Sequence, residues 1–358
     1  MKKVDFIIVG QGLAGTTLAH SIEKKGGSFV IIDNCTKTTS SFAAAGIFHP
    51  FSFKRLLLSW KASIFIPSAI SFYSSIENKL GKKLFSNHSL YRVFSSIEEQ
   101  NNWSLKQTIS PYSNFMGENI SKDDLFNKII RPFGVGKVEH AGRLDVTKYV
   151  NESRNYFKNK GAFLNSAFNY ENVIQKNNSI IYKNWLAPSI IFCEGPKYTQ
   201  NPFFNYLPHN PCKGEIIIIE SAELPNKLIN KGCFIYPLGN KRFIVGSTYN
   251  HRELNYNCSE SGKNELLKKL SSLGDFKYKI IDQKAGVRPT TKDRRPLIGE
   301  HPCLNNMYIF NGLGSKGVMM APFLSSQLIN SILNDAEIDP EANISRYADD
   351  YLKLTNQL

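Results

Sequence analysis

A glycine-rich turn near the amino terminus limits the folds open to this chain. The apolar run VDFIIVG leads into Gly10-Gln11-Gly12-Leu13-Ala14-Gly15, and a helical pattern and a second apolar run ending in Asp33 follow. In such a unit the first glycine permits a tight turn, the second lets the backbone approach a pyrophosphate, and the third lets helix and strand pack closely. Helix amides would bind phosphates, and Asp33 would bind ribose hydroxyls. The pattern predicts a Rossmann-like dinucleotide site; the alternative is the same turn without a ligand.

Length and charge define the broad class of protein. A chain of 358 residues is longer than a single hydrophobic core usually supports, which predicts two domains. The formal charge of +14 comes from 44 Lys and Arg against 30 Asp and Glu, and these basic residues are scattered, with no run of five or more. Scattered lysines are typical of a solvated surface, so nucleic acid is a less favoured partner than a small molecule.

Cysteine spacing and hydropathy predict the cellular compartment of the chain. The six cysteines lie far apart, with no CxxC and no Cys/His cluster at ligand spacing, which predicts reduced thiols and no metal site. Asp5 and the glycines interrupt the apolar start, so it resembles a first strand more than a signal peptide. No stretch reaches the roughly 18 apolar residues of a membrane span. We expect a soluble, cytoplasmic protein.

A second glycine-rich turn lies near the other end of the chain. In NMYIFNGLGSKGVMMAP a strand pattern precedes Gly312-Leu313-Gly314-Ser315-Lys316-Gly317, and an amphipathic helix follows. No further strand comes after that helix, so an independent nicotinamide dinucleotide site is not expected. The helix amino terminus would instead face one more anionic group, such as a reduced flavin.

Small residues in SSFAAAGIFHP, residues 40–50, would let a backbone segment approach a flat ligand, although they also suit an ordinary helix start. This segment, the two glycine motifs, IIFCEGP and GVRPTTKDRRPLIG occur in an order that resembles the FAD-dependent amine oxidases of the D-amino-acid oxidase, glycine oxidase and sarcosine oxidase type. The resemblance extends over the whole chain. It implies FAD and oxidation of a C–N bond by hydride transfer to flavin N5, with oxygen or another electron acceptor. Sarcosine oxidases tether FAD through a cysteine near the arginine motif, but Cys303 does not lie at the matching place, so we expect non-covalent FAD.

The resemblance also implies an α/β (α+β overall) flavoprotein with two interleaved domains. Residues 1–84, 142–204 and 284–358 would form a Rossmann-like FAD-binding domain, in which IIYKNWLAPSIIFCEG looks like two strands that return to the sheet. Residues 85–141 and 205–283 carry antiparallel signals, including a hairpin at Gly239-Asn240, and would form the substrate domain. The residues expected to bind FAD are Gly10, Gly12, Leu13, Ala14, Gly15, Asp33, Asn34, Ala44, Ala45, Gly46, Val173, Glu194, Gly195, Gly312, Gly314, Ser315, Lys316, Gly317 and Val318.

Arg288 is the candidate anchor for a substrate carboxylate. It matches the arginine of the G-x-R-P motif that grips the carboxylate in the resembling oxidases, and a guanidinium can bind a carboxylate through two parallel hydrogen bonds. The alternative is an arginine paired with a carboxylate of its own protein. Tyr236, Tyr249 and His49 are candidates for the pocket wall, although each residue also suits a purely structural role.

One departure from the family bears on the substrate. Glycine and D-amino-acid oxidases tend to have an arginine where this chain has Ser315, and GLGSKG looks more like the LGSRG of the bifunctional enzyme that modifies the tRNA wobble uridine. This departure raises a modified tRNA uridine as an alternative substrate, while the resemblance as a whole and Arg288 lead us to expect a small amino acid or secondary amine. A flavin-binding protein without turnover is a further alternative.

Overall fold

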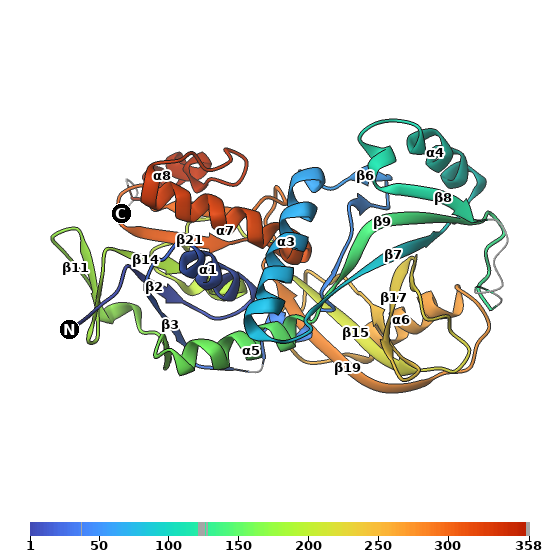
Figure 1. The fold of residues 1–358 in the computed structure, drawn as a ribbon, viewed down its shortest axis with the longest axis horizontal. Helices are drawn as coiled ribbons and strands as arrows, with labels where there is room; N and C mark the ends of the chain where they lie inside the picture. The colour runs from blue at the N-terminus through green and yellow to red at the C-terminus, as the bar shows by residue number, and fades with distance from the viewer. Residues whose placement is uncertain (37, 121–125, 127, 356–358) are drawn as a thin grey trace.

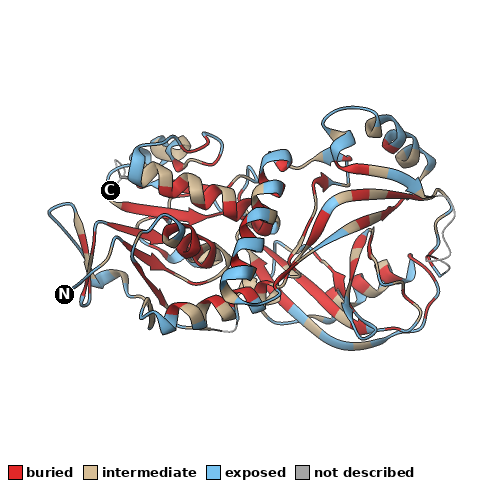
Figure 2. Ribbon diagram, viewed as in Figure 1, coloured by how far each residue is buried: buried red, intermediate tan, exposed pale blue. Residues whose placement is uncertain are grey.

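The structure is a computed structural model that describes residues 1–36, 38–120, 126 and 128–355. Two large sheets lie at opposite ends of the molecule, and the long helix α3 (Ala62–Leu80) lies between them (Figure 1). Buried residues run along the central strands of both sheets (Figure 2). The chain therefore has the mixed α/β architecture that the sequence predicts.

The first sheet has six strands in the order β10-β3-β2-β14-β21-β20. All neighbours pair in parallel except β20 and β21. The central strands are short apolar runs buried along their length, as expected of a parallel sheet covered on both faces. Their bounds are β2 (Phe6–Val9), β3 (Phe29–Asp33), β10 (Phe163–Asn165), β14 (Ser189–Phe192), β20 (Leu297–Glu300) and β21 (Met307–Asn311).

The two predicted glycine-turn helices lie next to each other on this sheet. They are α1 (Leu13–Lys24) and α7 (Gly317–Asn334) (Figure 1). A hydrogen bond of 2.7 Å between Ser21 Oγ and Ser325 Oγ joins them. The helix α5 (Val146–Asn159) has a strong apolar face and leads into the edge strand β10. The short helix α8 (Ala348–Thr355) follows near the carboxyl terminus.

One expectation about this region is corrected. The sequence suggested that both strands in IIYKNWLAPSIIFCEG return to the main sheet, but only β14 does so. The strands β12 (Ser179–Tyr182) and β13 (Trp185–Ala187) pair antiparallel across a tight turn. They build a separate four-stranded sheet because β13 pairs with β1 (Lys2–Lys3) and β12 pairs with β11 (Val173–Lys176).

The other large sheet is mostly antiparallel. Its strands run in the order β19-β15-β18-β17-β16-β7-β9-β4, with β8 paired to β9. The predicted hairpin joins β17 to β18, and Asn240 and Lys241 have φ values of 49° and 59°, typical of a tight hairpin turn. The bounds are β4 (Ile47–Phe48), β7 (Phe85–Val93), β8 (Met116–Ile120), β9 (Val135–Leu144), β15 (Cys212–Glu220), β16 (Leu228–Lys231), β17 (Cys233–Gly239), β18 (Arg242–Gly246) and β19 (Lys279–Arg288).

Smaller elements complete the fold. The helix α2 (Ser40–Ala43) lies against β19, and β5 (Phe51–Ser52) pairs with β6 (Leu57–Leu58). The helices α4 (Ile97–Gln107) and α6 (Glu260–Ser271) lie at the far end of the antiparallel sheet (Figure 1). Among the helices of the described residues, none has the length and apolar character needed to cross a bilayer.

Candidate cofactor and substrate site

The two glycine motifs, 300 residues apart in sequence, meet in the structure. A Cβ added to Gly317 would lie 3.1 Å from Leu13 Cδ2, so the starts of α7 and α1 are in contact. The backbone N–H of Gly314 donates to the carbonyl of Pro289 at 3.1 Å. The carboxyl-terminal glycine turn therefore lies between the amino-terminal motif and the strand end that carries Arg288.

Close backbone contacts explain two glycines of the first motif. Gly10 has φ of +94°, and a Cβ there would lie 2.7 Å from the carbonyl oxygen of Cys193. A Cβ on Gly15 would lie 2.0 Å from the carbonyl oxygen of Gly10, so any side chain would separate α1 from the turn. These contacts place the start of α1 at the carboxyl edge of β2 and β14, where ligands bind in open parallel sheets.

The amino terminus of α1 is suited to an anion. Gly12 occupies the N-cap position without a side-chain cap, and the first turn has no acidic residue. Ser41 Oγ accepts the backbone N–H of Leu13 at 2.9 Å, and Ala14 lies in the same first turn. Ser41 thus joins the segment at residues 40–46 to this helix end. The partial positive charge of this helix end would stabilise a phosphate.

Asp33 lies at the end of β3, as predicted, and holds the neighbouring turns. Its carboxylate accepts the backbone N–H groups of Gln11 at 2.8 Å and Cys35 at 2.6 Å. Arg154 lies 3.8 Å away and donates to Gln11 Oε1 at 2.6 Å. Asn34 is exposed beside this carboxylate. The contact of Arg154 with this turn was not apparent in the sequence, because Arg154 lies 121 positions after Asp33.

The small-residue segment lies between the two large sheets. Gly46 has φ of +76°, and a Cβ there would lie 1.9 Å from the carbonyl oxygen of Leu144. The carbonyl of Ala45 accepts Arg143 Nε at 2.9 Å, whereas Ala44 is exposed. Arg143, which the sequence analysis did not identify, therefore ties this segment to β9.

Glu194 is a buried carboxylic acid at the carboxyl edge of the six-stranded sheet. Tyr170 donates to Glu194 Oε1 at 2.5 Å, and Asn201 donates to Oε2 at 2.8 Å. Burial raises the pKa of Glu194 to about 7, although both hydrogen bonds and Lys197 oppose this shift. Two other residues that were predicted to bind FAD lie close in sequence to Glu194 and Tyr170. The carbonyl of Gly195 accepts a hydrogen bond of 2.9 Å from Asn311 Nδ2, and the half-buried Val173 is the first residue of β11.

Lys316 connects the second glycine turn to the segment after Gly46. Its Nζ donates to the carbonyls of His49 at 3.1 Å and Phe51 at 3.0 Å. Burial lowers the pKa of Lys316 to about 7. No carboxylate of the described residues lies within 4 Å of this ammonium. An anionic ligand at this place would stabilise the charged form of Lys316, which burial otherwise disfavours.

His49 lies beside Lys316 rather than in an exposed turn. Its ring stacks on Phe53 with centroids 4.9 Å apart, and its Nδ1 is buried with no hydrogen-bond partner among the described residues. Burial lowers the pKa of His49, and the nearby Lys316 and Arg92 lower it further. The neighbouring Ser315 is exposed and Val318 is buried in α7.

Arg288 is held in a defined position without an acidic partner. Its guanidinium donates to Ser247 Oγ at 2.8 Å and to the carbonyl of Thr248 at 3.3 Å. It also lies 4.5 Å from the ring centroid of Tyr249, and Gly214 leaves space for it, because a Cβ there would lie 1.9 Å from Nη2. Within the described parts of the chain, no Asp or Glu pairs with Arg288. The alternative of an internal ion pair is therefore not supported.

The two predicted tyrosines lie in different surroundings. Tyr236 is buried, its hydroxyl lies 3.0 Å from both Ser86 Oγ and His88 Nε2, and Arg143 lies 5.3 Å from its ring centroid. Tyr249 is 63% exposed and contacts Arg288 instead. Ser86, His88 and Arg143 gave no motif in the sequence, because they meet only through pairing and packing in the antiparallel sheet.

The arrangement fits a dinucleotide with a flavin ring. The amino termini of α1 and α7 face the junction between the sheets, neither is capped by its own N-cap side chain, and neither has an acidic residue in its first turn. The buried Nδ1 of His49 has no hydrogen-bond partner among the described residues, and Lys316 Nζ there contacts two backbone carbonyls but no described carboxylate. Such groups normally find a hydrogen bond or counter-charge, which a bound cofactor would provide.

Curated proteins of similar sequence include oxidoreductases. The chain is 24% identical over 95% of its length to the tRNA 5-methylaminomethyl-2-thiouridine biosynthesis bifunctional protein MnmC of Leptospira interrogans, and it spans 59% of that protein. It is 22% identical to the uncharacterized oxidoreductase YurR of Bacillus subtilis, covering 93% of this chain and 96% of that one. It is also 27% identical to the glycine oxidase of Bacillus subtilis over 37% of this chain and 36% of that one.

Solved structures share the fold. The glycine oxidase of Bacillus cereus superposes with a TM-score of 0.77 at 17% identity, covering 93% of this chain and 96% of that one. The L-proline dehydrogenase of P. horikoshii superposes with a TM-score of 0.77 at 15% identity, covering 99% of both chains. The family model described as FAD dependent oxidoreductase (DAO) matches residues 5–329. The chain therefore belongs to this family and is an FAD-dependent oxidoreductase.

Proposed function

We propose that this enzyme oxidises the C–N bond of a small amino acid or secondary amine that carries a carboxylate. The six-stranded sheet and its helices would form the FAD-binding domain, and the antiparallel sheet would form the substrate domain. The observation that carries the proposal is Arg288, a guanidinium without an acidic partner in the described structure, next to the loop that contacts α1.

Arg288 would fix the substrate by its carboxylate. Ser247 and the carbonyl of Thr248 hold one side of the guanidinium, and Tyr249 supports its face, so the group is oriented before the substrate binds. Two parallel hydrogen bonds would then set both the position and the direction of the substrate. Preorganisation of this kind reduces the conformational entropy lost on binding.

The remaining candidate residues would hold FAD. Gly10, Gly12, Gly15 and the end of α1 suit the pyrophosphate, and Asp33 suits a ribose. Ala45, Gly46, Lys316 and the start of α7 suit the flavin ring. When bound, FAD supplies the hydride acceptor. The amine would lose a hydride from carbon and a proton from nitrogen, and water would hydrolyse the resulting imine.

A modified tRNA uridine is a second candidate substrate. The 24% identity to the MnmC protein extends over 95% of this chain, and the Ser315-Lys316 pair and the +14 charge are compatible with a polyanion. Against this candidate, the basic residues are scattered along the sequence. Binding of tRNA should weaken steeply with added salt, whereas binding of a small amine should depend on salt only weakly.

Anaerobic mixing tests the proposal. The purified FAD-loaded enzyme is mixed with glycine, sarcosine, other amino acids and modified tRNA, and loss of the visible flavin absorbance is followed. We expect bleaching by an amine that carries a carboxylate. If no amine bleaches the flavin, the proposed function is wrong and a binding protein without turnover becomes the better description.

A further inference from the structure

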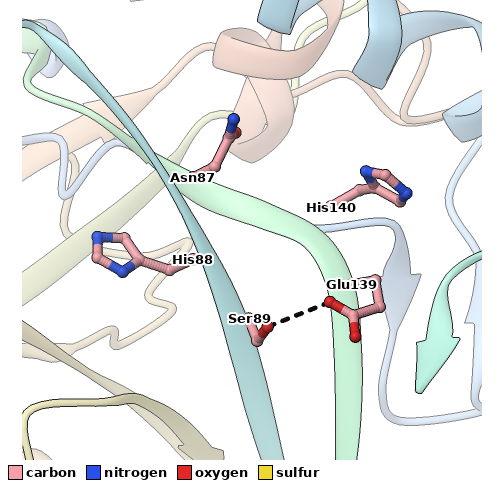
Figure 3. Close-up of a pocket in the computed structure, with 5 residues that line it drawn as sticks. All are labelled: Asn87, His88, Ser89, Glu139 and His140. Carbon is pink, nitrogen blue, oxygen red and sulfur yellow. Dashed lines mark hydrogen bonds between the residues drawn. The ribbon is translucent and has the colours of Figure 1, made fainter.

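Two groups of polar side chains on the antiparallel sheet lie outside the proposed cofactor and substrate site. The first group lines a surface pocket on β7 and β9 and consists of Asn87, His88, Ser89, Glu139 and His140 (Figure 3). His88 and His140 extend from opposite sides of the strand pair, so this group does not converge on one ligand (Figure 3). The second group lies behind Arg288 and is centred on a buried ion pair between Lys213 and Glu215.

The ion pair lies on the opposite face of β15 from the candidate substrate anchor. The guanidinium of Arg288 lies over Gly214, because a Cβ there would lie 1.9 Å from its Nη2. Successive side chains of a strand point to opposite faces of the sheet, so Lys213 and Glu215 point away from Arg288. Lys213 Nζ lies 3.6 Å from Glu215 Oε1. A Cβ on Gly262 of α6 would lie 2.6 Å from the same oxygen, so this helix covers the pair.

Both charged side chains hold one end of a loop. This loop, residues 247–259, runs from the end of β18 to the start of α6 and is called the anchor loop below. Lys213 Nζ donates to Asn255 Oδ1 at 2.9 Å and lies 3.7 Å from the carboxylate of Glu253. The carboxylate of Glu215 accepts the backbone N–H of Ser259 at 2.9 Å and its hydroxyl at 2.6 Å. The ion pair therefore fixes the carboxyl-terminal half of the anchor loop.

The other end of the anchor loop holds the guanidinium of Arg288. Ser247 Oγ and the carbonyl of Thr248 accept its N–H groups, and the ring of Tyr249 lies against its face. Thr248 is joined in turn to Glu215, because its backbone N–H donates to the carbonyl of Glu215 at 3.1 Å and its Oγ1 accepts the N–H of Glu215 at 2.9 Å. One loop thus contacts both the substrate anchor and the buried ion pair.

We propose that Lys213 and Glu215 are positioning residues that fix the direction of the Arg288 guanidinium by holding the anchor loop. The inference rests on the proposed function and adds the residues that orient its substrate anchor. Stability alone does not account for two buried charges here, because apolar residues of similar size in place of a buried ion pair often leave stability unchanged or raise it. An anchor that is oriented before the substrate arrives binds it with less loss of entropy.

The test measures the order of the anchor loop and the binding of a carboxylate in the FAD-loaded enzyme. Lys213→Met removes the buried ammonium, and Asn255→Ala removes its hydrogen-bond partner at an exposed position, where a change does not endanger folding. Asn257→Ala, at an exposed position of the same loop, is the matched control. Amide hydrogen exchange followed by mass spectrometry reports the order of the loop. Calorimetry reports the dissociation constant of benzoate, a probe whose only polar group is a carboxylate.

Both variants should loosen the anchor loop and weaken carboxylate binding. We expect faster exchange over residues 247–259 and a dissociation constant for benzoate that is about fivefold higher, because a displaced guanidinium forms poorer hydrogen bonds. Asn257→Ala should match wild type in both measurements. With an amine that bleaches the flavin, KM should rise by a similar factor, whereas the rate of flavin reduction at saturating amine should change less than about twofold.

A second comparison shows whether the ion pair acts through Arg288. In an Arg288→Lys background the group that the anchor loop orients is absent, so adding Lys213→Met should change the dissociation constant of benzoate by less than about twofold. Equal weakening by Lys213→Met in both backgrounds overturns the positioning role, because the ion pair would then act on the whole site.

The outcomes separate this inference from the proposed function. Unchanged exchange in the anchor loop of both variants, or faster exchange with unchanged benzoate binding, overturns the positioning role and leaves the function intact. If no amine bleaches the flavin while both variants weaken benzoate binding and Asn257→Ala does not, only the proposed function fails. If wild type does not bind benzoate, the positioning role is overturned whatever the bleaching assay shows.

Discussion

The Nζ atom of Lys316 donates a hydrogen bond of 3.0 Å to the backbone carbonyl of Phe51. This bond joins the carboxyl-terminal glycine turn to the segment that follows Gly46, two parts of the chain that are far apart in sequence. The ammonium at this junction is buried and has no acidic partner in the described structure. Its charge should therefore depend on both pH and the cofactor.

We predict that FAD binding is pH-dependent through Lys316. Because burial lowers the pKa of Lys316 to about 7, the apoprotein loses this charge as pH rises above about 7. A negatively charged cofactor favours the protonated amine, so binding should take up a proton, and the dissociation constant for FAD should rise between about pH 7 and pH 9. Titration of the apoprotein with FAD, followed by flavin fluorescence at each pH, measures this dissociation constant. Lys316→Met should remove this pH dependence of FAD binding, whereas Lys292→Met, at an exposed position, should keep it. Identical pH profiles for wild type and Lys316→Met would show that Lys316 is not linked to FAD binding.

Arg288→Lys should impair substrate use but not FAD binding. Lysine keeps the charge but cannot form two parallel hydrogen bonds, and it loses the flat contact with Tyr249. We expect kcat/KM for an amine that carries a carboxylate to fall by about 100-fold, mainly through KM. The visible spectrum of the bound flavin should stay unchanged. Arg242→Lys, at an exposed position on β18, is the control, and equal activity of Arg288→Lys and Arg242→Lys would rule out the anchor.

Gly15→Ala should abolish FAD binding and destabilise the fold. The new methyl would lie 2.0 Å from the carbonyl oxygen of Gly10 and 3.3 Å from Cys193 Cβ, and the Gly10 backbone cannot rotate away as a flexible side chain can. We expect a loss of unfolding free energy of about 2 kcal/mol or more in urea denaturation. Gly12→Ala is the comparison, because its methyl would meet Ser41 Oγ at 3.0 Å and this side chain can rotate. Gly12→Ala should fold nearly normally and weaken FAD binding. Equal stability of the two variants would contradict this explanation.

Glu194 should make the stability of the apoprotein decrease with pH. Its pKa rises from 4.5 to about 7 on folding, mainly through burial, so the folded protein retains a proton that the unfolded chain releases in this window. The folded state binds more protons there, and the free energy of unfolding must fall as pH rises from about 4.5 to about 7. Urea unfolding of wild type and Glu194→Gln at several pH values should show their difference changing over this window. The free energy of unfolding of Glu98→Gln, a change at an exposed position, should differ from that of wild type by the same amount at every pH. If the difference between Glu194→Gln and wild type is also constant, the raised pKa of Glu194 is refuted.

Much of the fold and part of the site follow from local patterns. The glycine spacing at residues 10–15 requires a tight turn between strand and helix, and the contacts of Gly10 and Gly15 provide the physical reason. The hairpin between β17 and β18 follows from alternating apolar residues around Gly239-Asn240. The destination of β12 and β13 was predicted wrongly, because strand periodicity indicates a strand but does not indicate which sheet it joins.

Local sequence was enough to predict the two glycine turns, the acidic residue at the end of β3 and Arg288 as a candidate anchor, because each prediction uses residues close together in the chain. The contacts of Arg143 with Ala45, of His88 with Tyr236 and of Tyr170 with Glu194 become apparent only once the chain is folded. These contacts depend on strand order, strand bulges and the packing of sheets. Burial decides the charge of Lys316 and Glu194, because desolvation acts only after distant segments have excluded water.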